Sequence, residues 1–214
     1  MRSGALRPEM QFATLAQQGE TAQLGMWVFI ATETLFFGAL LFAYFVYRNL
    51  YPEEFAQAAK ETVLWCGILN TGLLLTSSLT MVLAIEAAAA GRRQALTNWL
   101  LATAALGIAF ILIKSYEWYL DYQDGVVPAV HFFMKLDQAP AGELFWVFYF
   151  IATPLHALHL SIGVGLLFFM LTRARRGELT SGYFAPLEVV GLYWSFVDTV
   201  WIFLFPAIYL VGRS

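Results

Sequence analysis

One stretch, residues 24–47, constrains the fold of this chain more than any other. It reads LGMWVFIATETLFFGALLFAYFVY, and its 24 residues include one ionisable group, Glu33. A helix needs about 20 apolar residues to cross the hydrocarbon core of a bilayer, so the stretch predicts a transmembrane helix. Glu33 lies roughly 14 Å along that helix, near the midplane. Its carboxyl group must therefore be protonated, or must face another helix or an internal water. Two interpretations follow: a structural hydrogen bond between helices, or a proton-linked or lipid-linked site.

The composition extends this conclusion to the whole chain. With 60% hydrophobic and 13% charged residues, the sequence is typical of a polytopic membrane protein. A formal net charge of −3 argues against nucleic-acid binding through a basic surface. Cys66, the only cysteine, lies in a hydrophobic run, which excludes a disulfide framework and a thiolate metal cluster. Residues 1–23 show no signal-peptide pattern and are expected to form an N-terminal cytoplasmic segment.

Four further apolar runs are long enough to span a membrane, namely residues 62–85, 97–120, 144–172 and 189–212. The predicted fold class is therefore all-α: a bundle of five transmembrane helices that forms a single domain over residues 24–212. Lys and Arg are more frequent in the N-terminal segment and in the second and fourth connectors, where seven occur against four on the other side. The positive-inside rule then predicts that the N-terminus is inside and the C-terminus outside.

Ionisable residues in the spans are expected to meet inside the bundle. Glu33 and Asp198 each lie roughly 14 Å from the inner side, and His159 and His156 lie slightly higher. Because charge inside a membrane is costly, comparable depth favours one buried polar cluster of Glu33, His156, His159 and Asp198. Lys114 and Glu117, three residues apart near the outer end of the third span, predict an ion pair.

Other side chains indicate helix contacts and lipid contacts rather than catalysis. A seam in the second span, suited to hydrogen bonds between helices, comprises Asn70, Thr71, Ser77, Ser78 and Thr80. Arginines at the inner ends of helices either hold anionic lipid headgroups or only set the topology. They are Arg92, Arg93, Arg173, Arg175 and Arg176. Two histidines on one helix face, with His131 in a loop, do not make a haem or metal site, and we expect no catalytic residue.

Five motifs, in order along the chain, carry a resemblance. GMWVFIATETLFFGALLFAYF, LNTGLLLTSSLTM, KSYEWY, TPLHALHLSIG and YWSFVDTVWIFLFPAIYL resemble subunit III of the haem–copper oxidases, that is, cytochrome c oxidase subunit III. The resemblance spans residues 24–212. This sequence resembles the short bacterial form of the subunit, which has five helices instead of seven.

The resemblance implies a non-redox subunit of a terminal oxygen reductase in aerobic electron transport. Such a subunit belongs to a proton-translocating oxidoreductase but has no catalytic centre of its own. Haem and copper would be held by partner subunits, with subunit I as the main contact and subunit II in the same complex. Bound phospholipid, support of proton uptake by subunit I and a place in the bacterial cell membrane are also implied. Glu33 matches the family's carbodiimide-reactive glutamate, and His156, His159, Glu117 and Asp198 match further family positions.

Two departures from the family pattern leave the oxidase type open. Ser195 stands where the family usually has histidine, and Pro154 where it usually has glycine. Alternatives are an accessory protein of a quinol oxidase or nitric oxide reductase, with other respiratory complexes as further candidate partners, and an autonomous proton or solute carrier. A carrier would be expected to show broken helices in two related halves, and this sequence has no such repeat.

Overall fold

The computed structural model describes residues 10–128, 131–132, 141–179, 183–210 and 213. Its helices are α1 (Leu15–Leu50), α2 (Pro52–Glu61), α3 (Leu64–Ala89), α4 (Arg93–Gln123), α5 (Ala141–Arg176) and α6 (Ala185–Phe205), and α6 continues into a π-helical turn, η1 (Pro206–Leu210). Two short strands, β1 (Val126–Val127) and β2 (His131–Phe132), pair in antiparallel fashion. Five helical segments are long and apolar enough to cross a membrane: α1, α3, α4, α5, and α6 with η1.

The five predicted spans are confirmed, but the helices extend beyond the apolar runs. At the N-terminal side, α1 begins at Leu15, so the helix includes the last nine residues of the expected segment 1–23. Thr14 caps this start, because its hydroxyl oxygen accepts a hydrogen bond from the Gln17 amide at 3.1 Å. The last residues of the predicted fifth span, 211–212, lie outside the described residues.

The helix α2 was also missed, because its sequence is too short and too polar to read as a span. Pro52 occupies its first turn, where a missing amide hydrogen costs nothing. Glu53 and Glu54 follow it, next to the positive end of the helix dipole. The buried side of α2 faces the bundle and packs against α5. It comprises Phe55, Ala58 and Ala59.

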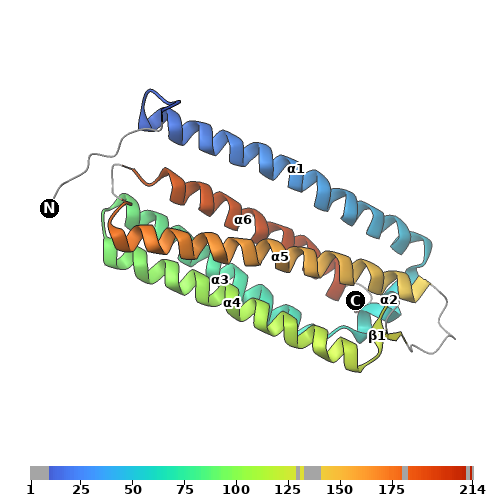
Figure 1. Cartoon of the computed structure of the whole chain (residues 1–214). Helices are drawn as coiled ribbons and strands as arrows, with labels where there is room; N and C mark the ends of the chain where they lie inside the picture. The colour runs from blue at the N-terminus through green and yellow to red at the C-terminus, as the bar shows by residue number, and fades with distance from the viewer. Residues whose placement is uncertain (1–9, 129–130, 133–140, 180–182, 211–212, 214) are drawn as a thin grey trace.

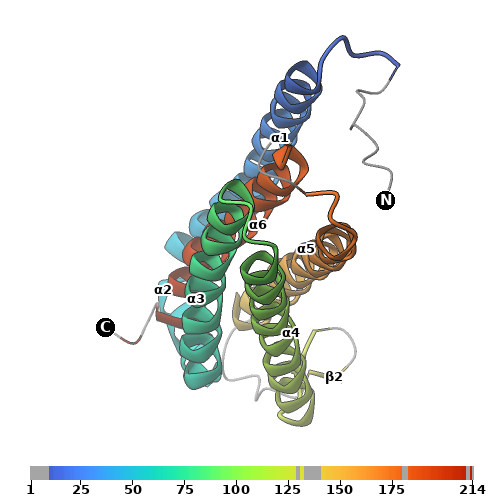
Figure 2. The same ribbon diagram turned by 90° about the vertical axis from the view of Figure 1, so that its left-hand side faces the viewer.

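The central helix of the bundle is α6, which packs against α1, α3 and α5. Helix α4 lies between α3 and α5. Figure 1 shows the long helices running side by side, and Figure 2 shows α1 and α4 at opposite edges.

A single residue, Trp194 on α6, contacts three other helices at one level of this bundle. Its indole N–H donates to Ser77 Oγ on α3 at 3.0 Å, and its ring fills space left by Gly107 on α4 and Gly163 on α5.

Helix α1 is the least covered of the spanning helices. Of its 36 residues only Gly19, Phe37 and Tyr44 are buried. Large apolar side chains along it are exposed, with Leu35 at 75% and Phe42 at 71%. Its main neighbour is α6, with fewer contacts to α5 and α2, so most of the surface of α1 is left for lipid or for another chain.

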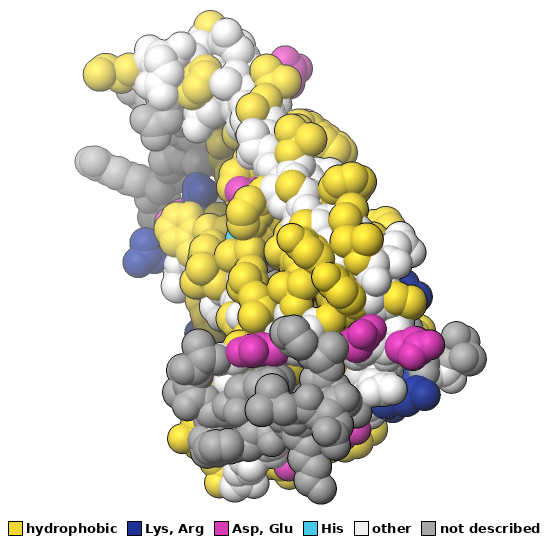
Figure 3. Space-filling view, turned by 90° about the vertical axis from the view of Figure 1, so that its right-hand side faces the viewer, with side chains coloured by type: hydrophobic (Ala, Val, Ile, Leu, Met, Phe, Trp, Pro, Cys, Tyr) yellow, Lys and Arg dark blue, Asp and Glu magenta, His cyan; other side chains and the backbone are white. Residues whose placement is uncertain are grey.

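The bundle has two distinct ends. We call the end where α1 and α6 begin the N-terminal end, and the end that holds α2, β1 and η1 the C-terminal end (Figure 1). Figure 3 looks onto the C-terminal end and shows acidic side chains in a band beside a mostly hydrophobic surface. At this end the Arg213 guanidinium donates to the carbonyl oxygens of Lys60 at 2.9 Å and Thr62 at 2.5 Å, which fastens the chain terminus to the end of α2.

Candidate functional site

Glu33 finds its partner on α5. Its Oε2 lies 3.3 Å from Nε2 of His159. The other ring nitrogen of His159, Nδ1, lies 2.8 Å from the Leu155 carbonyl oxygen, which can only accept, so Nδ1 carries a hydrogen. Nε2 of His159 therefore faces the Glu33 carboxyl group, and a proton placed between the two atoms would make either a neutral hydrogen-bonded pair or an ion pair. Phe37 covers the imidazole edge-on, with ring centroids 5.3 Å apart.

His156 lies in a different environment from His159. It is buried, with Phe110 and Trp201 at ring-centroid distances of 5.6 and 5.2 Å. Neither ring nitrogen has a hydrogen bond to the described residues. The imidazole is thus enclosed by aromatic rings and has no polar partner among the described residues.

Asp198 faces α3 rather than the histidines. Its Oδ2 accepts a hydrogen bond from Ser78 Oγ, and the side chain is 4% exposed. The predicted single cluster therefore divides, in the described structure, into three environments, of which only the Glu33–His159 pair joins two of its members. Depth along the membrane was predicted from the spacing, but the direction in which each side chain points around its helix was not.

The hydroxyl seam of α3 does connect helices, as predicted. Ser77 accepts from Trp194, Thr71 accepts from Trp201 Nε1 at 3.0 Å, and Thr80 shares a hydrogen bond of 2.8 Å with Thr103 on α4. The amide of Asn70 is buried without a hydrogen bond to the described residues. These bonds hold α3 to α4 and α6.

Lys114 and Glu117 form the predicted ion pair, but inside the protein. Lys114 Nζ lies 3.1 Å from Glu117 Oε2, and both side chains are at most 1% exposed. The ammonium group also donates to the phenol oxygens of Tyr149 at 3.0 Å and Tyr209 at 2.5 Å. Tyr209 donates to Glu117 Oε1 at 2.6 Å, and the Tyr149 hydroxyl lies 2.6 Å from Asp121 Oδ2. These five residues form the lysine network, which joins α4, α5 and η1 near the C-terminal end.

The arginines at the N-terminal end differ in whether their guanidinium groups have an acidic partner. Arg92 pairs with Glu86 at 3.1 Å, and Arg173 and Arg176 both approach Glu178, at 2.9 and 3.9 Å. Among the hydrogen bonds of the described residues, the Arg93 side chain donates only from its Nε, to the Ala174 carbonyl at 3.0 Å. Arg93 and Arg175 line one polar pocket between α4 and α5, together with Gln94, Thr97, Asn98 and Leu101.

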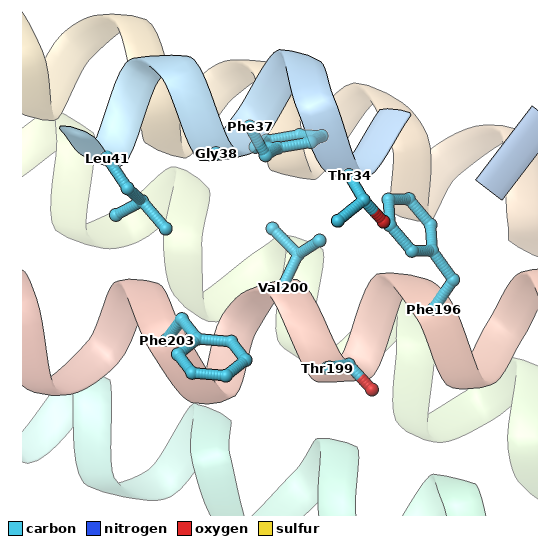
Figure 4. Close-up of a pocket in the computed structure, with 8 residues that line it drawn as sticks. All are labelled: Thr34, Phe37, Gly38, Leu41, Phe196, Thr199, Val200 and Phe203. Atoms are coloured by element: carbon cyan, nitrogen blue, oxygen red, sulfur yellow. The ribbon is translucent and has the colours of Figure 1, made fainter. Parts of the chain in front are cut away.

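An apolar groove runs between α1 and α6 (Figure 4). Its cavity volume is about 260 Å³. Phe37, Gly38 and Leu41 line it from α1, and Phe196, Val200 and Phe203 line it from α6, with the hydroxyl-bearing Thr34 and Thr199. Because Phe37 also covers His159, the groove adjoins the Glu33–His159 pair.

Comparison with known families decides the relationship. The family model described as cytochrome c oxidase subunit III matches residues 10–213. The chain belongs to this family. A subunit III protein of Alkalihalophilus pseudofirmus, named cytochrome c oxidase subunit 3, is 31% identical over 91% of this chain and 89% of its own length. Probable quinol oxidase subunit 3 proteins of Staphylococcus haemolyticus and Staphylococcus aureus USA300 are 29% and 30% identical, each over 91% of both chains.

In this subunit III chain, three members of the lysine network were missed from the sequence. Asp121 could have been found, since it lies four residues after Glu117 and seven after Lys114, on the same helix face. Tyr149 and Tyr209 come from other helices, and no spacing links them to α4. No three His, Cys, Asp or Glu side chains group as metal ligands within the described part of the subunit III chain.

Proposed function

We propose that this chain is the non-redox subunit III of a terminal oxygen reductase of the cytochrome c oxidase type. In this role it stabilises subunit I, contacts subunit II, and helps to keep protons available where subunit I takes them up. The complex would lie in the bacterial cell membrane, with the N-terminal end of the bundle inside and the C-terminal end outside. Haem and copper would be held by the partner subunits.

The family match over residues 10–213 carries this proposal, since it covers every spanning helix. The sparse cover of α1 supports it, because this helix offers a long apolar face to a neighbouring subunit. Lipid tails also cover such a face, so exposure by itself would not require a partner. The second candidate, a quinol oxidase subunit, is favoured by the names of two of the relatives. Oxygen uptake by the purified complex with reduced cytochrome c or with a quinol separates the two donors.

The role in turnover is tested by removing the chain from the purified complex. The haem spectrum and the initial rate of oxygen reduction are expected to persist, because electrons pass through other subunits. Activity is expected to fall faster than that of the complete complex during sustained turnover, and adding back the chain should restore its lifetime. Loss of the haem signals from the assembled remainder, or an unchanged lifetime, contradicts the proposed role. A free chain that transports protons or solutes would instead support the carrier alternative.

We also propose that the pocket at Arg93 and Arg175 holds the headgroup of an anionic phospholipid. Guanidinium groups bind phosphate well, and basic residues at a helix end attract anionic lipids. Along α4, exposed apolar side chains continue from this pocket toward the membrane centre: Leu101, Ile108 and Leu112. An acyl chain could follow them. Arg92, Arg173 and Arg176 already have acidic partners, which makes them weaker candidates.

Replacing Arg175 by glutamine is expected to weaken retention of anionic phospholipid about fivefold, as about 1 kcal/mol is lost per basic residue near the membrane surface. Native mass spectrometry after a delipidating wash would measure the retained lipid. Arg92→Gln is the matched control, because its guanidinium is paired with Glu86, and it should retain lipid like the wild type. Equal retention in both variants would leave these arginines with a topological role only.

A further inference from the structure

The Tyr149 hydroxyl faces two carboxylates with one hydrogen to give. Its oxygen lies 2.6 Å from Asp121 Oδ2 and 3.0 Å from Glu117 Oε1. A phenol O–H donates one hydrogen bond at a time, so only one of these contacts is a hydrogen bond from Tyr149 in any one state. The same phenol oxygen accepts from Lys114 Nζ at 3.0 Å, which fixes its position between the charges.

The charges of the lysine network do not balance when every group is ionised. Lys114 supplies one positive charge against the two negative charges of Glu117 and Asp121, and all three are at most 2% exposed. The other described titratable groups that interact with them are His156 and Tyr149 on α5, Tyr209 on η1, Cys66 on α3, and Asp124, the residue that follows α4. None of these described neighbours supplies a second cation: His156 lies in its aromatic site, and the others are neutral or acidic. An excess negative charge kept out of water is costly, so the network favours taking up one proton.

The donors in the network show which carboxyl group is left for that proton. Glu117 receives the ammonium group of Lys114 at Oε2 and the Tyr209 hydroxyl at Oε1. Its charge is therefore compensated by a cation and by a hydrogen bond. Asp121 has, among the hydrogen bonds of the described residues, only Tyr149 as a donor. Asp121 is thus the carboxyl group that is least stabilised as an anion.

We propose that the lysine network is a binding site for one exchangeable proton, which is carried by Asp121 and reported by the hydroxyl of Tyr149. With the proton bound, the Asp121 carboxylic acid donates to the phenol oxygen of Tyr149, and the Tyr149 hydrogen points to Glu117 Oε1. When the Asp121 O–H bond breaks, the proton passes to water, and the Tyr149 hydroxyl turns to donate to Asp121 Oδ2. The network then changes from neutral to a charge of −1; the Asp121 O–H is the one covalent bond broken, and the hydrogen bond of Tyr149 moves from Glu117 to Asp121.

The water that exchanges this proton lies at the C-terminal end. Asp121 is two residues from the end of α4, and Asp124 on the next turn is exposed. Toward the membrane centre, His156 contacts Phe110, one turn before Lys114 on α4, and its two ring nitrogens have no hydrogen bond to the described residues. The site is therefore a store that opens to one side and not a segment of a path across the membrane. This proton site is distinct from the proposed support of subunit I, because that role concerns proton uptake at the N-terminal end of the bundle.

Infrared spectroscopy of the whole purified oxidase tests the site. At neutral pH the complex with the wild-type chain should show one more protonated-carboxyl C=O band, shifted by D₂O, than the complex with Asp121→Asn. Asp124→Asn is the matched control, because this exposed carboxylate lies one turn away and should leave the band unchanged. Spectra without any difference between wild type and Asp121→Asn would overturn the proposal, as would loss of the band in Asp124→Asn.

Tyr149→Phe provides a second variant in case Asp121→Asn does not assemble. Phenylalanine keeps the ring and both carboxyl groups but removes the hydroxyl that accepts from the protonated Asp121. The C=O band should remain and shift to higher frequency, because its O–H has lost a hydrogen-bond acceptor. A band at the wild-type frequency in Tyr149→Phe would show that Tyr149 does not contact the protonated carboxyl, and the proposal would fail.

Discussion

Replacing Lys114 by methionine is expected to lower the free energy of unfolding of the bundle by about 3–5 kcal/mol, the cost of leaving a buried charge without its partner. Methionine has a similar length but no charge, so Glu117 and Asp121 would remain buried without a cation. The phenols of Tyr149 and Tyr209 would lose the ammonium donor at the same time. Loss of helicity of the chain in detergent micelles, titrated with a denaturing detergent, measures the change.

The control for Lys114→Met is the same substitution in a solvent-exposed ion pair. Arg92 and Glu86 lie 3.1 Å apart, but their side chains are 60% and 65% exposed, so Arg92→Met should cost no more than about 1 kcal/mol. A double variant, Lys114→Met with Glu117→Gln, should recover part of the loss, because it also removes the carboxylate that pairs with Lys114. If Lys114→Met costs as little as Arg92→Met, the lysine network contributes nothing to stability.

Trp194→Ala is expected to destabilise the chain by about 3–5 kcal/mol, as for other large-to-small changes of a buried aromatic residue. The ring is fully buried between Gly107 and Gly163, and its N–H bond to Ser77 would be lost as well. Because the lipid around the bundle is itself apolar, the loss comes from packing contacts across four helices and not from exposure to water. The loss of unfolding free energy in Trp194→Ala should therefore lie near the lower end of this range.

Two further variants separate the ring of Trp194 from its N–H group. Trp194→Phe keeps an aromatic ring and removes the hydrogen bond, so it should cost about 1 kcal/mol for that bond, with a smaller cavity term. Trp27→Ala removes an indole that is 57% exposed on α1 and should stay within about 0.5 kcal/mol of the wild type. The same detergent titration measures both. A Trp194→Ala value equal to that of Trp27→Ala would contradict a role of Trp194 in joining the helices.

The spanning helices were predictable because a membrane imposes a length and an apolar composition that are read directly from the sequence. Helix α2 was not predicted, because its ten residues, polar and apolar mixed, are neither long enough nor apolar enough for a span. Its buried side is buried only because α5 lies beside it. The turns that extend α1 to Leu15 are polar, so the hydropathy pattern ended before the helix did.

The polar sites were predictable only in part. Depth correctly suggested that Glu33 would meet a group on another helix, and His159 is that group. Depth could not show that Asp198 points toward α3. The role of Tyr209 was hidden for a different reason: the π-helical turn after Pro206 departs from the 3.6-residue period on which such predictions rest.

The contacts of α1 also determine the order in which the chain can be built. Its main neighbour, α6, begins at Ala185, 135 positions after α1 ends at Leu50. At a synthesis rate of about 5–20 residues per second, α1 waits on the order of ten seconds in the membrane before α6 has been made. During that time Tyr44 lacks the Ala207 carbonyl to which its hydroxyl donates at 2.6 Å in the finished bundle. The first helix to be inserted thus completes its packing only when the last helix has been made, and until then lipid covers the side of α1 that α6 will contact.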